Sequence, residues 1–449
     1  MPGDWCVETF ENAPLQIIDG DRGTNYPNQT EFSAAGHCLF LNAGNVTTTG
    51  FRFSDCAFIT AEKDALLRKG KLVRNDVVLT TRGTVGNAAY FDDSVPFDNI
   101  RINSGMVILR AQTPALHPRY LYLFVRSALF HAQVSALRTG SAQPQLPIQD
   151  INRIEIPIPP SDEQHAIAHI LGTLDDKIEL NRRMNETLVA MTRALFKSWF
   201  VDFDPVRAKV AGRDPGLPKS LADLFPDSFE DSELGEIPKG WRVCFIRDLT
   251  SNIQYGFTQS ASSDLVGPRF LRITDIQGGK VDWSTVPYCE VTPEEHERYS
   301  LKPGDVLVAR TGASTGENIY LSYAPDAVFA SYLVRFQFPD LANARLVVAF
   351  MRTQAYFEYV AGGIGGSAQP NASAQVLAGA QLVVPTPSIA RMFSDLVVPL
   401  DLSIVANAHE SRTLTALRDT LLPKLISGEL RIEDAKRVIH DPPGQAAGE

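Results

Sequence analysis

The most regular pattern of apolar and polar residues lies between residues 161 and 200. Apolar or small polar residues recur there at alternating steps of four and three, the heptad spacing that keeps one face of a long helix against a partner helix. No proline interrupts the pattern, so it predicts a single helix of about 60 Å at about 1.5 Å per residue. The positions of this seam are Ile167, Leu171, Leu174, Ile178, Asn181, Asn185, Leu188, Thr192, Leu195 and Trp199.

A short apolar strand, Ile154–Ile158, is expected to precede the helix and to end at Pro159 and Pro160. Ser161 is predicted to open the helix, with Gln164 three residues later completing a capping box. The asparagines in the seam favour one specified register, because buried polar side chains disfavour slipped pairings. A long amphipathic helix that packs on its own domain is the alternative interpretation.

The chain uses this plan twice, which is its strongest internal signal. The pentapeptide GSAQP occurs at Gly140–Pro144 and again at Gly366–Pro370, an offset of 226 residues. Other matches in the same order are Phe40-Leu41 with Phe270-Leu271, Asp76–Leu79 with Asp305–Val308, and Arg82-Gly83 with Arg310-Thr311-Gly312. The seam recurs at Leu400, Ile404, Asn407, Leu414 and Leu421, so a second long helix is predicted. We expect Pro399 to kink that helix and Pro423 to break or kink its last turns.

The repeat predicts an α+β protein with two mixed α/β domains separated by two long antiparallel helices, an intramolecular coiled coil with pseudo-two-fold symmetry. The expected segments are a first module (1–153), a first long helix with its leading strand (154–200), a linker (201–240), a second module (241–387), a second long helix (388–430) and a flexible tail (431–449). The linker contains 5 basic and 9 acidic residues with several prolines, so it indicates a surface connector with one short helical turn at most.

Local patterns predict some elements inside the first module. Two strands, Asp76–Thr81 and Asn87–Phe91, are expected on either side of a turn that contains Gly83 and Gly86. The stretch Pro118–Leu137 begins with proline and has apolar residues at helical spacing, so it predicts one helix.

Composition narrows the class of protein. A chain of 449 residues with 44% hydrophobic residues suits a soluble protein of two to four structural units, without a membrane-spanning apolar run or a signal peptide at its start. Its five cysteines form no CxxC pair, which favours a cytoplasmic protein with reduced thiols. The net charge of −10 is concentrated in the linker, and the modules are close to neutral. Charge therefore neither supports nor excludes nucleic-acid binding.

The sequence contains no catalytic constellation that we can identify. A phosphate-binding GxxxxGK[ST] loop is absent. His165 and His169 lie one helical turn apart but no third metal ligand is suggested nearby, so solvated helix histidines are the ordinary interpretation and no metal is expected. The sequence Asp441–Gly444 resembles an amino-methyltransferase loop only by chance, because its aromatic residue is missing.

Basic residues near turns are the candidates for contact with phosphate. Arg82 and Arg310 follow predicted strands at glycine turns, where an arginine and backbone N–H groups can meet a phosphate, although a plain hairpin with an exposed arginine fits equally well. A local run of basic residues can also contact phosphate. The alternative is that these side chains only form a solvated charged surface. The run comprises Arg68, Lys69, Lys71 and Arg74.

At this point the chain resembles the specificity subunit of type I restriction–modification systems. The resemblance covers nearly the whole chain and rests on the repeat and on three phrases. These are IPIPPSDEQHAIAHILGTLDDKIELNRRMNETL, SWFVDFDPV and TLLPKLISGEL. It implies two target-recognition domains that each read one half of a bipartite DNA sequence, held apart by the two helices. The candidates for base contact are then Arg101, Arg269 and Arg272. One departure is Ser388–Arg391, which replaces Ser161–Gln164 at the start of the second helix and puts its capping in doubt.

The resemblance also implies partners. Two methyltransferase subunits would dock on the helices, restriction subunits would join them, and the ligand would be double-stranded DNA without any membrane. The chain itself would be non-catalytic and without cofactor, so S-adenosylmethionine, ATP and Mg²⁺ are expected in the partner subunits. Two other classes stay open, a coiled-coil scaffold that binds proteins without DNA, and a nuclease or methyltransferase with an unrecognised site.

Overall fold

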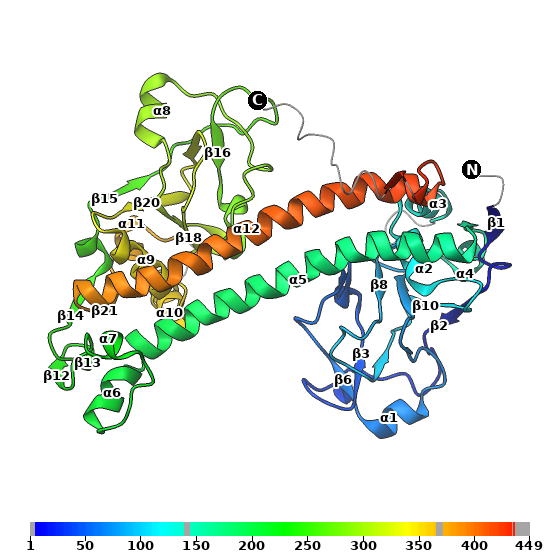
Figure 1. Cartoon of the computed structure of the whole chain (residues 1–449), viewed down its shortest axis with the longest axis horizontal. Coiled ribbons are helices and arrows are strands. Elements are labelled where there is room, and N and C mark those ends of the chain that lie inside the picture. Colours follow the sequence, from blue (N-terminus) through cyan, green and yellow to red (C-terminus); the bar gives the residue numbers. More distant parts are fainter. Residues whose placement is uncertain (1–4, 139–143, 365–370, 433, 436–449) are drawn as a thin grey trace. The chain divides into compact units, whose positions relative to one another are not determined.

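The computed structural model describes residues 5–138, 144–364, 371–432, 434 and 435 (Figure 1). The chain divides into unit 1, Met1–Asn181 with His409–Glu449, and unit 2, Arg182–Ala408. Each unit therefore contains one module and about half of each long helix. Most of the first GSAQP pentapeptide, all of the second, and the predicted flexible tail beyond residue 435 lie outside the described residues.

Unit 1 is built on a four-stranded antiparallel sheet in the order β2-β10-β7-β8. Its strands are β2 (Leu15–Asp19), β10 (Met106–Ala111), β7 (Val77–Thr80) and β8 (Ala88–Tyr90). Both faces are buried, so the central strands contain continuous apolar runs, Val77–Leu79 in β7 and Met106–Leu109 in β10, instead of alternating. Along β7, Val77 and Leu79 join one hydrophobic cluster, whereas Val78 joins another.

Different elements cover the two faces of this sheet. On one face, the cluster that contains Val77 includes residues of α2 (Pro118–Val125) and α3 (Ala128–Leu137). On the other, the cluster that contains Val78 includes residues of a smaller sheet in which β3 (Cys38–Phe40) pairs with β6 (Phe58–Ile59) and, in parallel, with β9 (Ile100–Arg101). The remaining short elements of the module are β4 (Val46–Thr47), β5 (Gly50–Phe51), α1 (Ala61–Leu66) and α4 (Ile148–Ile151).

Unit 2 repeats this topology, which confirms the duplication predicted from the sequence. Its four-stranded sheet has the order β15-β20-β17-β18, again antiparallel throughout. The strands are β15 (Asn252–Tyr255), β20 (Leu333–Gln337), β17 (Val306–Ala309) and β18 (Asn318–Tyr320). A parallel pair, β16 (Arg269–Leu271) with β19 (Ala327–Phe329), corresponds to β3 and β9. The helices are α8 (Pro293–Tyr299), α9 (Leu341–Met351), α10 (Gln354–Gly363) and α11 (Ala374–Ala378).

The single helix predicted over Pro118–Leu137 is wrong, because two helices occupy that stretch. α2 ends at Val125, and the Ser127 hydroxyl accepts a hydrogen bond from the Phe130 N–H to cap α3. Unit 2 makes the same break, where Thr353 caps α10 after α9 ends at Met351. An N-cap hydroxyl inside an apolar helical pattern is the sequence signal that marks this break.

Each module ends in a strand that leads into a long helix. In unit 1, β1 (Cys6–Thr9) pairs antiparallel with β11 (Glu155–Ile158), and α5 (Ser161–Phe200) follows. In unit 2, β14 (Arg242–Phe245) pairs antiparallel with β21 (Gln381–Val384), and α12 (Pro387–Ile426) follows. The first helix has the predicted bounds. The second runs without a break through Pro399 and Pro423, so the break expected at Pro423 does not occur.

Within each unit the two long helices run antiparallel. In unit 1, Asp175 accepts from Arg418 at 2.9 Å, and Asn181 donates to Glu410 at 2.7 Å. In unit 2, the ring of Phe393 packs against those of Phe196 and Phe200. Of the predicted seam, Ile167, Leu171, Leu174, Asn181, Asn185, Trp199 and Leu421 are buried, and Ile178, Leu188, Thr192, Leu195, Leu400, Ile404, Asn407 and Leu414 are half-buried.

The capping box predicted at Ser161 and Gln164 is also wrong. Gln164 is buried, and its side-chain oxygen accepts from the His117 N–H at 2.8 Å. Its amide nitrogen donates to the carbonyls of Ala115 and Pro159. Gln164 therefore ties the start of α5 to the loop before α2 and leaves no atom for a capping box.

The linker at 201–240 is a folded part of unit 2, not the surface connector expected from its composition. It forms α6 (Asp204–Val210), α7 (Lys219–Ala222) and a hairpin of β12 (Phe229–Ser232) with β13 (Gly235–Pro238). Phe203, Val206, Phe225 and Ile237 are buried in the hydrophobic cluster that also contains Trp199 and Trp241. Burial of these aromatic and aliphatic side chains outweighs the acidic, proline-rich composition of the segment.

Candidate nucleic-acid interface

The glycine turn of unit 1 joins β7 to β8 at one edge of the sheet. Gly83 and Gly86 have φ values of 72° and 94°, which L side chains adopt only with strain. The N–H groups of Thr81 and Arg82 both point to the Gly105 carbonyl, at 2.8 and 3.2 Å. Arg82 is exposed, so its guanidinium is available to an external ligand.

The corresponding turn of unit 2 joins β17 to β18. Gly312 and Gly316 have φ values of 74° and 92°, and the Arg310 N–H donates to the Tyr332 carbonyl at 3.0 Å. A groove of about 400 Å³ lies beside this turn. It is lined by Ile273, Gln277, Thr311, Gly312, Ala313, Ser314 and Glu317.

Hydrogen bonds show that Arg310 does not correspond to Arg82. The Leu146 N–H donates to the Thr81 carbonyl at 2.9 Å, and the Ala372 N–H donates to the Arg310 carbonyl at 2.8 Å. Arg310 therefore occupies the position of Thr81, and Thr311 occupies that of Arg82. The sequence repeat, which pairs Arg82 with Arg310, is therefore wrong by one residue at this turn. The reason is that Arg-Gly and Arg-Thr-Gly differ in length.

Arg310 is held in a fixed orientation. Its guanidinium carbon lies 4.8 Å from the centre of the Tyr255 ring, and Nη2 donates to the Asn371 side-chain oxygen at 2.9 Å. Tyr255 is itself fixed, because its hydroxyl accepts from the Ala374 N–H at 2.7 Å. Stacking and hydrogen bonding together suit an arginine that presents its planar group to a ligand.

The loops at this edge of unit 1 approach each other closely. A Cβ atom on Gly20 would lie 2.3 Å from the Asn103 carbonyl oxygen, so only glycine fits there. Gly256 repeats this arrangement in unit 2, 2.3 Å from the Ala330 carbonyl oxygen. Arg22, which sequence reasoning missed, donates to the Ser104 carbonyl at 3.3 Å and to Asp19 at 3.1 Å. The loop at 20–23 gave no sequence signal beyond its glycines.

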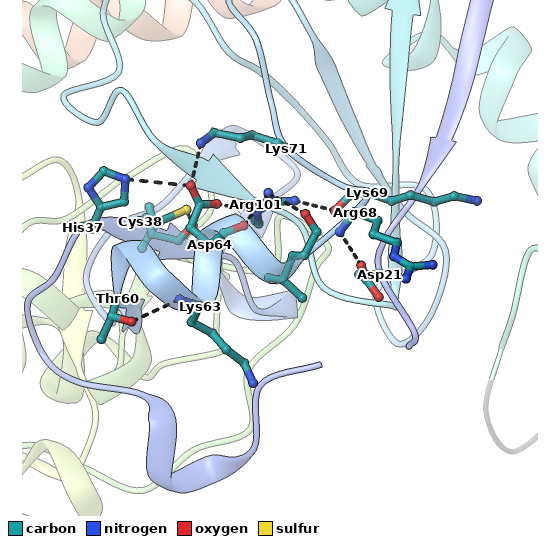
Figure 2. A network of polar contacts seen from close by, with 12 residues as sticks. Asp21, His37, Cys38, Thr60, Lys63, Asp64, Arg68, Lys69, Lys71 and Arg101 are labelled. Atoms are coloured by element: carbon teal, nitrogen blue, oxygen red, sulfur yellow. Dashed lines mark hydrogen bonds and ion pairs between the residues drawn. The ribbon is translucent and has the colours of Figure 1, made fainter. Parts of the chain in front are cut away.

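Only part of the predicted basic run is free for DNA. Arg68 and Lys69 are exposed, and no side-chain hydrogen bond or ion pair is recorded for either within the described part of the chain (Figure 2). Lys71 donates to Asp64 at 2.6 Å. Arg74 donates to the Asp92 and Val95 carbonyls and to Asp98, and it stacks on Phe91, so its donors are used inside the module.

Three of the base-contact candidates hold the fold together. Arg101 is 5% exposed, so we withdraw it as a DNA contact. Arg269 donates to the carbonyls of Ser284 and Val286 and stacks on the Tyr288 ring at 4.4 Å. Arg272 makes two hydrogen bonds to Asp275, at 3.0 and 2.9 Å. Part of the donor set of Arg269 and of Arg272 is therefore used inside unit 2.

The carboxylates of Asp64 and Asp21 accept hydrogen bonds from cations and N–H groups around the basic run of unit 1. Burial alone would raise the pKa of the Asp64 carboxyl, but hydrogen bonds from Lys71 and Arg101 outweigh it and hold this pKa below its ordinary value. The Gly23 and Arg68 N–H groups lower the pKa of Asp21. Both groups are therefore charged at neutral pH, where they hold the surrounding cations and N–H groups in place.

The described residues contain no group of three or more metal-ligating side chains. His165 Nδ1 lies 2.8 Å from the Ser161 carbonyl oxygen, and its ring packs edge-on against His117. Over the same residues, no helix combines the length and apolar character that crossing a membrane requires.

Comparisons with known proteins agree with the duplicated fold. Residues 15–190 match the family model for the type I restriction modification DNA specificity domain. The HindI specificity subunit of Haemophilus influenzae is 25% identical over 460 residues, covering 92% of this chain and 98% of the relative. The MjaIX specificity subunit of Methanocaldococcus jannaschii is 24% identical, covering 97% and 95%.

A solved structure has the same fold. It is the S subunit of a type I restriction–modification system from M. genitalium, with a TM-score of 0.58 and 16% identity over 94% of this chain and 96% of that one. At this identity the likeness concerns the fold alone. Together with the matched domain and the relatives of nearly equal length, it leads to one conclusion: the chain is similar over nearly its whole length to the specificity subunits of type I restriction–modification systems.

Proposed function

We propose that this chain is the non-catalytic subunit that recognises DNA sequence in a type I restriction–modification complex. Each module would read one half of a bipartite target in double-stranded DNA. The observation that carries this proposal is the repeated loop edge, where Arg22 and Arg82 in unit 1 and Arg310 in unit 2 lie at matching ends of two sheets with the same topology. Arg22 and Arg82 are exposed and Arg310 is half-buried. Arginines on rigid loops suit contacts to phosphates and to base edges.

The long helices would set the distance between the two half-sites. α5 contains 40 residues, which corresponds to about 60 Å. At about 3.4 Å per base pair this length spans at most about 17 base pairs, so the unread gap between the half-sites must be shorter.

The outer surface of the helices would bind two methyltransferase subunits, and restriction subunits would complete the nuclease. Leu180, Met184, Met191, Leu402 and Val405 are exposed on α5 and α12, which supports this docking role. S-adenosylmethionine, ATP and Mg²⁺ would bind to those partners, in the cytoplasm. The two modules are close to neutral, so the partners would supply much of the phosphate contact.

The alternative is a coiled-coil scaffold that binds proteins without reading DNA, and the near-neutral modules favour it. A mobility-shift assay separates the two. The chain assembled with its methyltransferase partner is titrated with cognate and scrambled duplexes over a salt series. The cognate duplex is identified first, by mapping methylated positions genome-wide in cells with and without the chain. We expect binding to prefer the cognate duplex, and equal binding to both at every salt concentration would favour the scaffold.

A further inference from the structure

The segment after α1 in unit 1 carries adjacent cations at the surface. Arg68 and Lys69 are exposed, and Lys71 follows with a half-exposed side chain. With Arg101, Asp21 and Asp64 they form a group of four cations and two carboxylates, so the group is net positive. A loop with such a charge binds phosphate more tightly when its backbone conformation is fixed before binding. Ordering a flexible loop on binding costs conformational entropy.

A buried arginine fixes the backbone of this loop (Figure 2). The Arg101 guanidinium donates to the carbonyls of Lys69 at 2.7 Å, Asp64 at 2.8 Å and Leu67 at 3.0 Å. Its Nε donates to the Asp64 carboxylate, which also accepts from Lys71. The loop is therefore held from the inside by a side chain that is itself shielded from solvent.

A second carboxylate holds the same loop from the side. Asp21 accepts from the Arg68 N–H at 2.7 Å and from the Gly23 N–H at 2.8 Å. This bond connects the loop to the segment that carries Arg22, which in turn reaches the Ser104 carbonyl. Because Gly105 accepts from the Arg82 N–H, three consecutive loop contacts place Arg68, Arg22 and Arg82 along one edge of unit 1.

Unit 2 has the same kind of buried arginine, but the segment above it has no net positive charge. Arg335 is 5% exposed and donates to the carbonyls of Ser300 and Arg298 at the end of α8. The exposed charges of this segment are Glu294, Glu297, Arg298 and Lys302, which balance to zero. A buried arginine under the loop thus belongs to the fold of both modules, but of the two loops it is that of unit 1 that combines it with two adjacent exposed cations and a net positive charge.

We propose that the loop at 67–71 is a preorganised clamp for DNA phosphates, with Arg68 and Lys69 as the contacts and Arg101 with Asp64 as positioning residues. This inference rests on the proposed DNA-recognition function. Phosphate contacts carry no base information, so the clamp sets affinity and salt dependence, whereas the choice of sequence resides in other residues. The partner chemistry is a duplex backbone, and no particular sequence is required at the clamp.

The test uses the assembled complex and a fluorescent cognate duplex between 50 and 200 mM salt. The double variant Arg68→Ala/Lys69→Ala should reduce the slope of log K against log salt by about 2, since each phosphate contact contributes about 0.9. Over this range the affinity of the wild type should therefore fall about tenfold more than that of the variant. The preference for the cognate over a scrambled duplex, measured at 50 mM salt, should stay the same.

A charge-matched control comes from the equivalent segment of unit 2. Arg298→Ala/Lys302→Ala removes the same charge from an exposed loop and should leave the slope within 0.5 of the wild type, which is about half of one phosphate contact. Equal slope changes in both double variants would mean that overall charge alone is measured, and would overturn the clamp. If the wild-type complex shows no sequence preference, the proposed function fails instead, so the two failures are distinguishable.

The positioning role has its own test. Arg101→Lys keeps the charge but cannot reach three carbonyls, so it should loosen the loop and reduce the effect of Arg68→Ala on the salt slope by half or more. If Arg101 only stabilised the core, Arg101→Lys would lower thermal stability. The effect of Arg68→Ala on the salt slope would then stay unchanged. That second outcome would remove Arg101 from the clamp, and circular dichroism of each variant verifies that the fold is intact.

Discussion

In unit 2 the side-chain amide of Asn407 on α12 donates to the side-chain oxygen of Asn185 on α5 at 2.9 Å. The Asn185 amide also lies 3.5 Å from the Ile404 carbonyl. Both asparagines occupy seam positions where apolar side chains would pack as well. Their hydrogen bond is satisfied in one alignment of the helices, so it specifies register at the expense of stability.

Breaking this pair should destabilise unit 2. Asn185→Ala leaves Asn407 without one partner inside the seam and should lower the free energy of unfolding by roughly 1–3 kcal/mol. Replacing both residues by leucine should restore or raise stability, because no polar group then stays buried at the pair. Urea denaturation followed by circular dichroism measures both. Met184→Ala, at an exposed position of α5, is the control and should change stability by less than about 0.5 kcal/mol.

The two close glycines should not tolerate a methyl group. Gly20→Ala and Gly256→Ala each place Cβ 2.3 Å from a backbone carbonyl oxygen, which should cost about 1–3 kcal/mol as the loops move apart. Gly362→Ala is the matched control in unit 2, because it lies in α10 with open space around it and should stabilise the helix slightly. Similar melting temperatures for Gly256→Ala and Gly362→Ala would contradict the close approach.

Asp64 should contribute to stability in a pH-dependent way. Its pKa is lower in the folded chain than the ordinary value of 3.8, so its contribution is fully present above pH 3.8 and is lost as pH falls through the folded value. Asp64→Asn should therefore reduce the free energy of unfolding at pH 7, and the difference from wild type should shrink below pH 4. Urea titrations from pH 7 to pH 3 measure this difference. The exposed Asp55→Asn serves as the control, and a difference that grows on acidification would contradict the assignment.

Arg310 should matter for the half-site read by unit 2. Arg310→Lys keeps the charge but loses the planar group that stacks on Tyr255 and bonds to Asn371, so affinity for cognate DNA should fall about tenfold or more. Arg247→Lys is the control, because Arg247 also stacks on an aromatic ring but lies before the other end of β15. Equal losses for both variants would contradict a special role for Arg310.

Lengthening both helices should change the spacing of the recognised sequence. One heptad inserted after Leu180 in α5 and one after Glu410 in α12 adds about 10 Å, which corresponds to about 3 base pairs. We expect the gap in the methylated target to widen by that amount while both half-sites stay the same. Genome-wide methylation mapping provides the measurement, and an unchanged gap would show that the helices do not set the spacing.

The sequence predicted the repeated architecture and the first helix well, because periodic burial over 40 residues and two copies of one plan leave strong signals. It did not predict the folded linker, since Phe203 and Phe225 pack against Trp241 within a hydrophobic cluster that also contains the distant residues Val306 and Phe393. Such long-range burial does not appear in local composition.

The candidate interface was predicted less completely, for a different physical reason. Local sequence does not distinguish an arginine whose side chain is exposed to solvent from one that donates to backbone carbonyls inside the fold. Arg82, Arg68 and Lys69 are exposed as expected, whereas Arg101 and Arg74 use their donors inside the module. Arg22 was missed because its loop becomes part of the edge only through contacts with Ser104 and Gly105 on a distant segment.

The division of α12 between the two units has a consequence for synthesis of the chain. Unit 2 is one continuous stretch, Arg182–Ala408, and can close as soon as it leaves the ribosome. Unit 1 needs Leu421, Leu425 and Ile426, which pack in the same hydrophobic cluster as Ile167 and Leu171. The unit that emerges first is therefore completed last, and until the last turns of α12 have been translated the apolar side of the first half of α5 stays open to chaperones.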